Sequence, residues 1–189
     1  MKPVEILLIG IAAGVAAFLI IRAQDAQSGF SDVGVQKIDF AQRAADSAAE
    51  LGNLFLEVIG MRGIRNNNPG NIRHSAIKWQ GMSDTQTDSA FVQFISPEYG
   101  IRALSKLLDT YSISYGLNTV QGIINRYAPS VENNTGSYVA AVAGALGVAP
   151  DQAIDVQARK YDLVRAIIKH ENGLMPYGLA QINGGLNLA

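Results

Sequence analysis

Hydrophobic positions follow three different patterns along this chain. The first is a continuous apolar run, because residues 6–21 contain no charged or strongly polar side chain. As a helix, this run would be roughly 24 Å long, somewhat shorter than a hydrocarbon core of about 30 Å. Lys2 and Arg22 flank the run and can extend their charged ends to a membrane interface. The pattern predicts an uncleaved transmembrane anchor over residues 1–23.

Two other interpretations of this segment remain open. A cleaved signal peptide needs a positively charged start and a small-residue cleavage site, but Lys2 is opposed by Glu5 and the run ends directly at Arg22. A helix buried in a water-soluble core is the other alternative. Gly10 and Gly14 form a GxxxG pattern, which lets helices approach closely in lipid. The anchor is therefore a candidate for self-association through these two glycines.

The second pattern is alanine-rich and helical. Residues 24–34 are rich in Ser, Gly, Asp and Gln, which is typical of a flexible connector. Over residues 35–59, apolar side chains recur at three- and four-residue steps, which predicts a helix that Gly60 ends as a C-cap. Most of the apolar stripe before Leu51 is alanine, so we expect a stalk that packs against its own copy or rests on the next domain. Residues 24–60 are thus predicted to be a linker and an amphipathic helix.

The third pattern is a series of short amphipathic segments over residues 61–189. Capping residues and stop signals predict helices over approximately residues 97–111, 119–127, 135–146 and 156–171. Alternating side chains predict short strands at residues 77–79 and 90–95. We therefore expect a mainly α domain with a small β element, of the α+β class, preceded by the anchor and the stalk.

The composition excludes several kinds of chemistry. The chain has 189 residues and a net charge of −1, which is not the charge of a nucleic-acid-binding domain. It contains no cysteine, so neither a disulfide nor a thiol nucleophile is possible. Its two histidines, His74 and His170, are too few to predict a zinc site. We expect no metal, no other cofactor and no nucleic-acid partner.

Residues 62–73, with the sequence RGIRNNNPGNIR, form the most distinctive motif. So much Asn, Gly and Pro cannot continue a helix or lie within a sheet, and residues 68–71 predict a tight turn. A turn of this kind presents amide groups that suit a polyhydroxylated or amide-rich ligand, although an ordinary connecting turn is the alternative. The three arginines of the motif, with Lys78, also form a basic patch suited to phosphate or carboxylate groups.

Glu171 is the candidate acid. It lies three and four residues after Ile168 and Ile167, and so continues the apolar stripe of the last long helix. Partial burial and the C-terminal end of a helix dipole both favour a protonated carboxyl group, which is what acid catalysis of glycosidic cleavage requires. A solvated glutamate in the last helical turn is the alternative. Asp84 or Asp88, between the predicted strands, could supply a second carboxylate.

Several blocks, in the same order along the chain, resemble a group of bacteriophage and prophage virion proteins. Members of this group are either structural proteins or lysozyme-like proteins that degrade peptidoglycan. The blocks are residues 62–73, WQG at 79–81, FVQFISPEYGIRA at 91–103, IINRYAP at 123–129, ENNT at 132–135 with Tyr138, and HENG at 170–173. A looser similarity is to bacterial glucosaminidases of the lysozyme superfamily, whose catalytic Glu precedes their asparagine-rich segment. Here the matching HENG motif follows the asparagine-rich segment. This order has two explanations: a circularly permuted lysozyme-like fold, or loss of the catalytic acid.

The resemblance implies a membrane-anchored, lysozyme-like enzyme that cleaves β-1,4 glycan bonds of peptidoglycan during entry or lysis, as a hydrolase or a lytic transglycosylase. Glu171 would be the general acid and Asp84 the second carboxylate. The implied substrate-binding residues are Asn66, Asn67, Asn68, Asn71, Arg73, Trp79 and Tyr177. Expected partners are peptidoglycan, a lipid membrane and capsid proteins, with the chain crossing the virion membrane or the host inner membrane once. The alternative is a non-catalytic virion membrane protein that supports the capsid or binds glycan.

Overall fold

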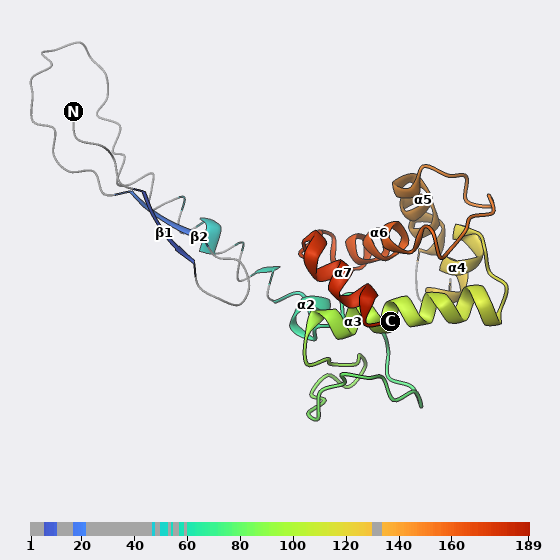
Figure 1. Cartoon of the computed structure of the whole chain (residues 1–189), viewed down its shortest axis with the longest axis horizontal. Helices are drawn as coiled ribbons and strands as arrows, with labels where there is room; N and C mark the ends of the chain where they lie inside the picture. The colour runs from blue at the N-terminus through green and yellow to red at the C-terminus, as the bar shows by residue number, and fades with distance from the viewer. Residues whose placement is uncertain are drawn as a thin grey trace, which may run out of the picture. The chain divides into compact units, whose positions relative to one another are not determined.

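The structure, a computed structural model, describes residues 6–10, 17–21, 47, 50–52, 54, 57–58, 60–129 and 134–189 (Figure 1). The chain divides into two compact units, Met1–Glu57 and Val58–Ala189. The larger unit contains all the helices named below and the candidate site.

A two-stranded antiparallel sheet forms the described part of the apolar N-terminal run. β1 (Ile6–Gly10) pairs with β2 (Ala17–Ile21), so that Ile6 lies opposite Ile21. The sequence predicted one helix over this region, and the structure differs by having strands. The β-branched residues of these stretches favour strands, although each strand of a two-stranded sheet pairs its backbone on one side only. Within the described residues, no helix is both long enough and apolar enough to cross a membrane.

Most residues of the predicted connector and stalk are not among those that the structure describes. The connector at residues 24–34 falls outside the described residues altogether. Of the helix predicted over residues 35–59, the described positions from residue 47 onward are helical, as is Gly60.

The larger unit is mainly helical in its described residues. Its elements are α2 (Arg62–Arg65), α3 (Pro97–Asp109), the π-helical η1 (Thr110–Ser114), α4 (Val120–Tyr127), α5 (Thr135–Leu146), α6 (Lys160–Asn172) and α7 (Leu179–Asn187). The prediction of a mainly helical domain is confirmed, and the four long helices are found. Helix α6 begins at Lys160 rather than at residue 156, and α7 lies in a tail for which the sequence predicted no helix.

Helix starts follow the local signals in the sequence. The Thr119 side chain accepts a hydrogen bond from the Gly122 N–H at 3.0 Å, and Asn134 accepts one from the Ser137 N–H at 3.2 Å. These side chains satisfy backbone donors that have no partner within the helix. Pro97 begins α3 at a position where its missing N–H removes no helical hydrogen bond.

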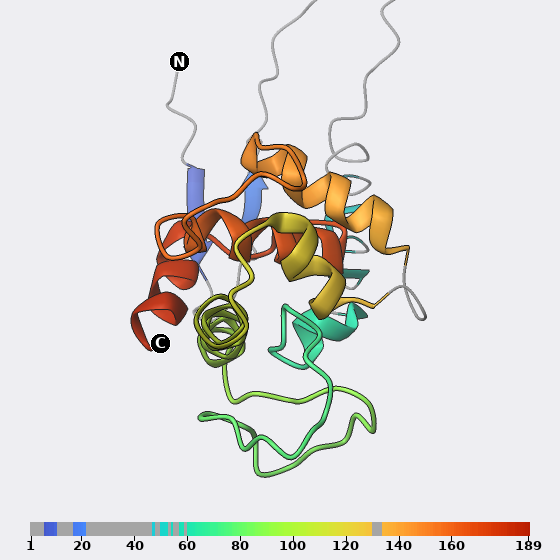
Figure 2. The same ribbon diagram turned by 90° about the vertical axis from the view of Figure 1, so that its right-hand side faces the viewer.

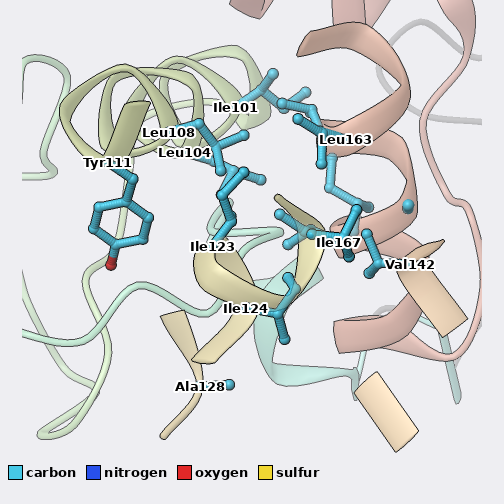
Figure 3. Packing of buried hydrophobic residues seen from close by; sticks show 14 of the residues in the cluster. Ile101, Leu104, Leu108, Tyr111, Ile123, Ile124, Ala128, Val142, Leu163 and Ile167 are labelled. Atoms are coloured by element: carbon cyan, nitrogen blue, oxygen red, sulfur yellow. The ribbon is translucent and has the colours of Figure 1, made fainter. Parts of the chain in front are cut away.

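The core lies where the long helices meet. Helix α3 contacts α6 and α7, and α5 contacts α4 and α6. Figure 3 shows fully buried side chains between these helices: Ile101, Leu104 and Leu108 from α3, Ile123 and Ile124 from α4, Val142 from α5, and Leu163 and Ile167 from α6. Burying each such aliphatic side chain contributes roughly 1.5–3 kcal/mol. This packing places the C-terminal end of α6 beside the N-terminal end of α5.

A long loop of residues 66–96 joins α2 to α3 and replaces the predicted strands. The loop contains two isolated antiparallel β-bridges, Arg73 with Phe91 and Met82 with Phe94. The described residues of the larger unit form no strand. The outer part of the loop extends from the side of α3 opposite to α5 and α6 (Figures 1 and 2). The small β element is therefore reduced to single bridges.

An asparagine side chain adds to the backbone pairing in this loop, where the Val92 N–H also donates to the Ile72 carbonyl oxygen at 3.0 Å. Asn68 is 0% exposed, and its Nδ2 donates to the carbonyl oxygens of Ile72 and Val92 at 2.9 and 2.8 Å. Its Oδ1 accepts from the Ile72 N–H at 2.9 Å. A carboxamide can do this because it has a donor and an acceptor, like a peptide group.

Candidate active site

Three segments that are distant in the sequence meet at Glu171, in the last turn of α6. Its Oε2 accepts a hydrogen bond from Asn71 Nδ2 at 2.9 Å, across 100 residues of sequence. Its Oε1 accepts one from the Tyr138 hydroxyl at 2.8 Å, and Tyr138 belongs to the first turn of α5. Both carboxyl oxygens are therefore oriented by neutral donors from two other parts of the chain.

Backbone geometry aims Asn71 at the end of α6. Asn67 and Asn71 have φ angles of 50° and 47°, in the left-handed region that asparagine adopts more readily than most residues. Asn172 donates to the Pro69 carbonyl oxygen at 2.8 Å and so ties the turn to α6. Gly63 allows this close approach, because a Cβ there would collide with the Asn172 side-chain oxygen.

Glu171 lines an open pocket of about 310 Å³. The other lining residues are Asn134, Ser137 and Tyr138 of α5 and its N-cap, and His170 of α6. The N-terminal end of α5 is the positive end of its dipole, whereas the C-terminal end of α6 is the negative end of its own. The positive end of α5 was not predicted to lie near Glu171. Within the described part of the chain, no lysine or arginine forms an ion pair with Glu171.

Aromatic rings support the Tyr138 hydroxyl. The His170 ring stacks on Tyr138 with centroids 3.7 Å apart, and Tyr127 meets Tyr138 edge-on at 6.3 Å. Burial raises the pKa of the Tyr138 hydroxyl well above its ordinary value, and Tyr127 and Glu171 act in the same direction. Tyr138 therefore remains a neutral hydrogen-bond donor. The Tyr127 hydroxyl donates to the Gly70 carbonyl oxygen, which adds a second tie to the asparagine turn.

Of the predicted site residues, the structure brings Asn71 and Glu171 together. The other asparagines of the motif point into the fold. Asn66 Nδ2 donates to the Asp88 carboxylate at 2.8 Å, and Asn67 Nδ2 donates to the Phe94 carbonyl oxygen at 3.0 Å. Like that of Asn68, these amides bind the protein itself and hold the loop against the motif.

The remaining predicted residues lie apart from this network. Trp79 is half-buried against the hydrophobic core, and Asp84 is exposed in the loop. Tyr177 is 7% exposed, and burial, with Glu98 nearby, raises the pKa of its hydroxyl to about 12. The structure records no hydrogen bond from these three described side chains to Glu171. The Arg73 guanidinium lies over the Phe91 ring, 5.0 Å from its centroid.

Sequence reasoning missed Tyr138 and His170 as site residues. A partial signal was present, because the Asn134 cap places Tyr138 in a first helical turn and His170 directly precedes Glu171. Only the packing of α5 on α6 shows that Tyr138 reaches the carboxyl group and that His170 covers the tyrosine ring.

Comparison with known proteins places the chain in a phage family. No protein-family model matches it. It is 38% identical over 127 residues to Protein P5 of Pseudoalteromonas phage PM2, an alignment that covers 66% of this chain and 79% of that protein. The chain belongs to the family of this phage protein. The resemblance to bacteriophage proteins is thereby confirmed. The relationship does not show that the domain is lysozyme-like.

The site of this P5-family chain is chemically suited to proton exchange with a polar ligand. Its described residues contain no cluster of three His, Asp or Glu side chains that could hold a metal ion. The pocket instead combines one carboxyl group with amide, hydroxyl and imidazole groups. Such groups can hydrogen-bond a polyhydroxylated ligand and exchange a proton with it.

Proposed function

We propose that this P5-family protein is a peptidoglycan glycosidase with Glu171 as its general acid. The observation that carries the proposal is the position of the Glu171 carboxyl group at the wall of an open pocket, oriented by Asn71 and Tyr138. A general acid must reach the leaving oxygen in a defined orientation. Asn71 and Tyr138 would act as positioning residues, because each holds one carboxyl oxygen.

A lytic transglycosylase reaction needs only this one carboxyl group. Glu171 would donate its proton to the glycosidic oxygen as the bond from that oxygen to the anomeric carbon breaks. A hydroxyl group of the same sugar would then attack the anomeric carbon and return its proton to Glu171. The carboxyl group ends as it began, and the product is an anhydro sugar formed without net addition of water.

This route is compatible with the described lining of the pocket. Glycoside hydrolases generally use a pair of carboxylates on either side of the bond. Among the described residues that line the pocket, Glu171 is the only acid, and Asp84 lies exposed in the 66–96 loop. The proposal therefore gives Asp84 no catalytic role.

The proposed cellular setting follows from the family and the N-terminal run. Relationship to a phage protein supports a virion component that acts during entry or lysis. The apolar run of residues 6–21 supports attachment to the virion membrane or the host inner membrane. Peptidoglycan and lipid would be its main partners, with capsid proteins and self-association through Gly10 and Gly14 as further contacts. The helical domain would correspond to a lysozyme-like fold.

The decisive experiment uses the full chain in detergent with purified peptidoglycan as substrate. Wild-type protein should release anhydromuropeptides, identified by mass spectrometry as lighter than the hydrolytic products by one water. Glu171→Gln should lower the rate by roughly 10²–10⁴-fold, the usual contribution of general acid catalysis. Its circular dichroism spectrum should match the wild type.

Asp84→Asn is the matched control, since it also removes one carboxylate, and it should retain full activity. Absence of muropeptide release by wild-type protein between pH 4 and 8 would rule out the enzyme and leave the non-catalytic structural role. Products that contain the added water would instead indicate a hydrolase.

A further inference from the structure

A second pocket of about 330 Å³ lies beside α2 and shares no lining residue with the Glu171 pocket. Its lining residues, which we call the arginine pocket, are Arg62, Arg65, Asn66, Thr87, Asp88 and Ser89. We propose that the arginine pocket binds a carboxylate group of the peptide stem of peptidoglycan. This inference rests on the proposed function for the identity of the substrate and deepens it by assigning a subsite.

Asp88 organises the pocket rather than serving as a ligand group. Its Oδ1 accepts the backbone N–H groups of Ala90 and Phe91 at 3.0 and 3.1 Å. Its Oδ2 accepts Asn66 Nδ2 at 2.8 Å and lies 3.3 Å from Arg62 Nε. These four partners use the acceptor positions of a carboxylate. Asp88 therefore holds Arg62 and Asn66 in place.

Arg62 is pre-positioned to bind an anion. Asp88 engages its Nε, and its guanidinium lies over the Phe91 ring at 4.9 Å from the centroid. The described structure records no bond to its terminal nitrogens, and the side chain is 54% exposed. Because Asp88 and the Phe91 ring engage only Nε and one face of the Arg62 guanidinium, the two terminal nitrogens remain available. Together they form a planar pair of donors that matches the two oxygens of a carboxylate. Arg65 adds a second exposed guanidinium, bonded through Nη1 to the Gly60 carbonyl oxygen at 3.0 Å.

The charge of the pocket favours a carboxylate over a phosphate dianion. Two arginines and one aspartate give a net charge of +1 among the lining residues, which a monoanion neutralises. Thr87 and Ser89 add hydroxyl groups, which can bond the amides that adjoin carboxylates in a peptide.

Chain connectivity limits how far apart the two pockets can lie. Asn66 lines the arginine pocket, and Asn71 bonds Glu171. Five residues of chain span at most about 18 Å. A peptide stem that branches from a glycan chain in the Glu171 pocket can therefore reach the arginine pocket.

The test measures binding by isothermal titration to full-length Glu171→Gln protein, which does not consume the ligand. The probes are a disaccharide pentapeptide with free carboxylates, the same compound with its carboxylates amidated, and the pentapeptide alone. We expect amidation to raise the Kd about tenfold or more. Arg65→Gln and Arg62→Lys should each raise the Kd for the free acid similarly, because one removes a charge and the other the planar fork. Arg165→Gln, an exposed arginine on α6 that lines neither pocket, should leave the Kd unchanged.

Equal Kd values for the free and amidated probes would overturn the inference, as would equal effects of Arg65→Gln and Arg165→Gln. Stronger competition by inorganic phosphate than by acetate would contradict the carboxylate assignment. The pentapeptide alone should show the same dependence on Arg65, which tests the subsite without the sugar. The proposed glycosidase activity is tested separately, by muropeptide release from the wild-type protein. It can therefore fail while the carboxylate subsite is confirmed, or the reverse.

Discussion

Asn68 shows how single side chains of the motif serve the fold. It is fully buried and bonds the backbone of Ile72 and Val92, so it reinforces two parts of the loop that also pair directly, through the Val92 N–H and the Ile72 carbonyl oxygen at 3.0 Å. The sequence indicated four amides available for a ligand. Three of them are used by the protein, and Asn71 alone reaches the candidate acid. The residue types were informative about hydrogen bonding but not about its partner, because a carboxamide bonds backbone and sugar equally well.

Asp88 makes the stability of the folded protein depend on pH in the acidic range. The hydrogen bond from Asn66, followed by the Ala90 N–H, lowers its pKa from the ordinary 3.8 to about 2. A group with a lowered pKa in the folded state stabilises the protein above its unfolded pKa, and this contribution is lost as the pH falls. The free energy of unfolding should therefore decrease between about pH 4 and pH 2. Asp88→Asn should show a shallower decrease in this window, measured by urea unfolding at several pH values.

The matched variant for this prediction is Asp84→Asn, which removes an exposed carboxylate from the same loop. It should retain the decrease seen in the wild type. Identical pH profiles for Asp88→Asn and the wild type would show that the Asp88 network does not stabilise the fold.

At the scale of elements, α3 and α7 are joined by a close approach at Gly185. A Cβ at this position would lie 2.5 Å from the Ile101 Cβ and 2.8 Å from the Glu98 carbonyl oxygen. Gly185→Ala should therefore lower the free energy of unfolding by about 1–3 kcal/mol, as for other overpacked sites. Urea unfolding of the purified protein measures this change.

The neighbouring glycine provides a control of opposite sign. A Cβ at Gly184 would meet only the Glu98 Cγ, at an ordinary 3.5 Å. Gly184→Ala should raise the free energy of unfolding by up to about 1 kcal/mol, because alanine favours a helix. If both variants shift stability by the same amount in the same direction, the close approach of α7 to α3 is wrong.

The long helices were predictable because their signals are local in the sequence. Helix α7 was not predictable because it depends on contacts that are remote in the sequence. Residues such as Thr119 and Asn134 signal a helix locally, through caps that depend on a few neighbours. Helix α7 contains Gly184 and Gly185, which disfavour a helix in isolation. It is stabilised by packing on α3 and by the Arg102 Nε bond to the Leu188 carbonyl oxygen at 2.9 Å, and these contacts are remote in sequence.

For the molecule as a whole, the apolar N-terminal run of residues 6–21 leads us to predict membrane attachment. We expect the full chain to float with phospholipid vesicles in a density gradient. Ala13→Arg should reduce flotation, because an arginine in the middle of a membrane-spanning segment costs roughly 2.5–3.5 kcal/mol. Gln27→Arg adds the same charge outside the run and should float like the wild type.

Flotation that is equal for Ala13→Arg and the wild type would mean that residues 6–21 do not enter lipid. A helix pairs its backbone groups within itself, whereas β1 and β2 pair only with each other and leave one side of each strand unpaired. Far-ultraviolet circular dichroism of the N-terminal segment in vesicles distinguishes the two.

The amino-acid sequence alone indicated the apolar N-terminal run and the mainly helical domain with its capped helices, and it predicted Asn71 and Glu171 as candidate site residues. These features follow from hydrophobic periodicity and from local hydrogen-bonding signals, which act over a few residues. The packing of the folded chain was needed to show that Asn71 and Tyr138 orient Glu171, that Asn68 stabilises a loop instead of strands, and that Asp88 organises an arginine pocket. Each of these joins residues more than twenty positions apart, and the side-chain chemistry of one partner does not specify the other until the helices pack.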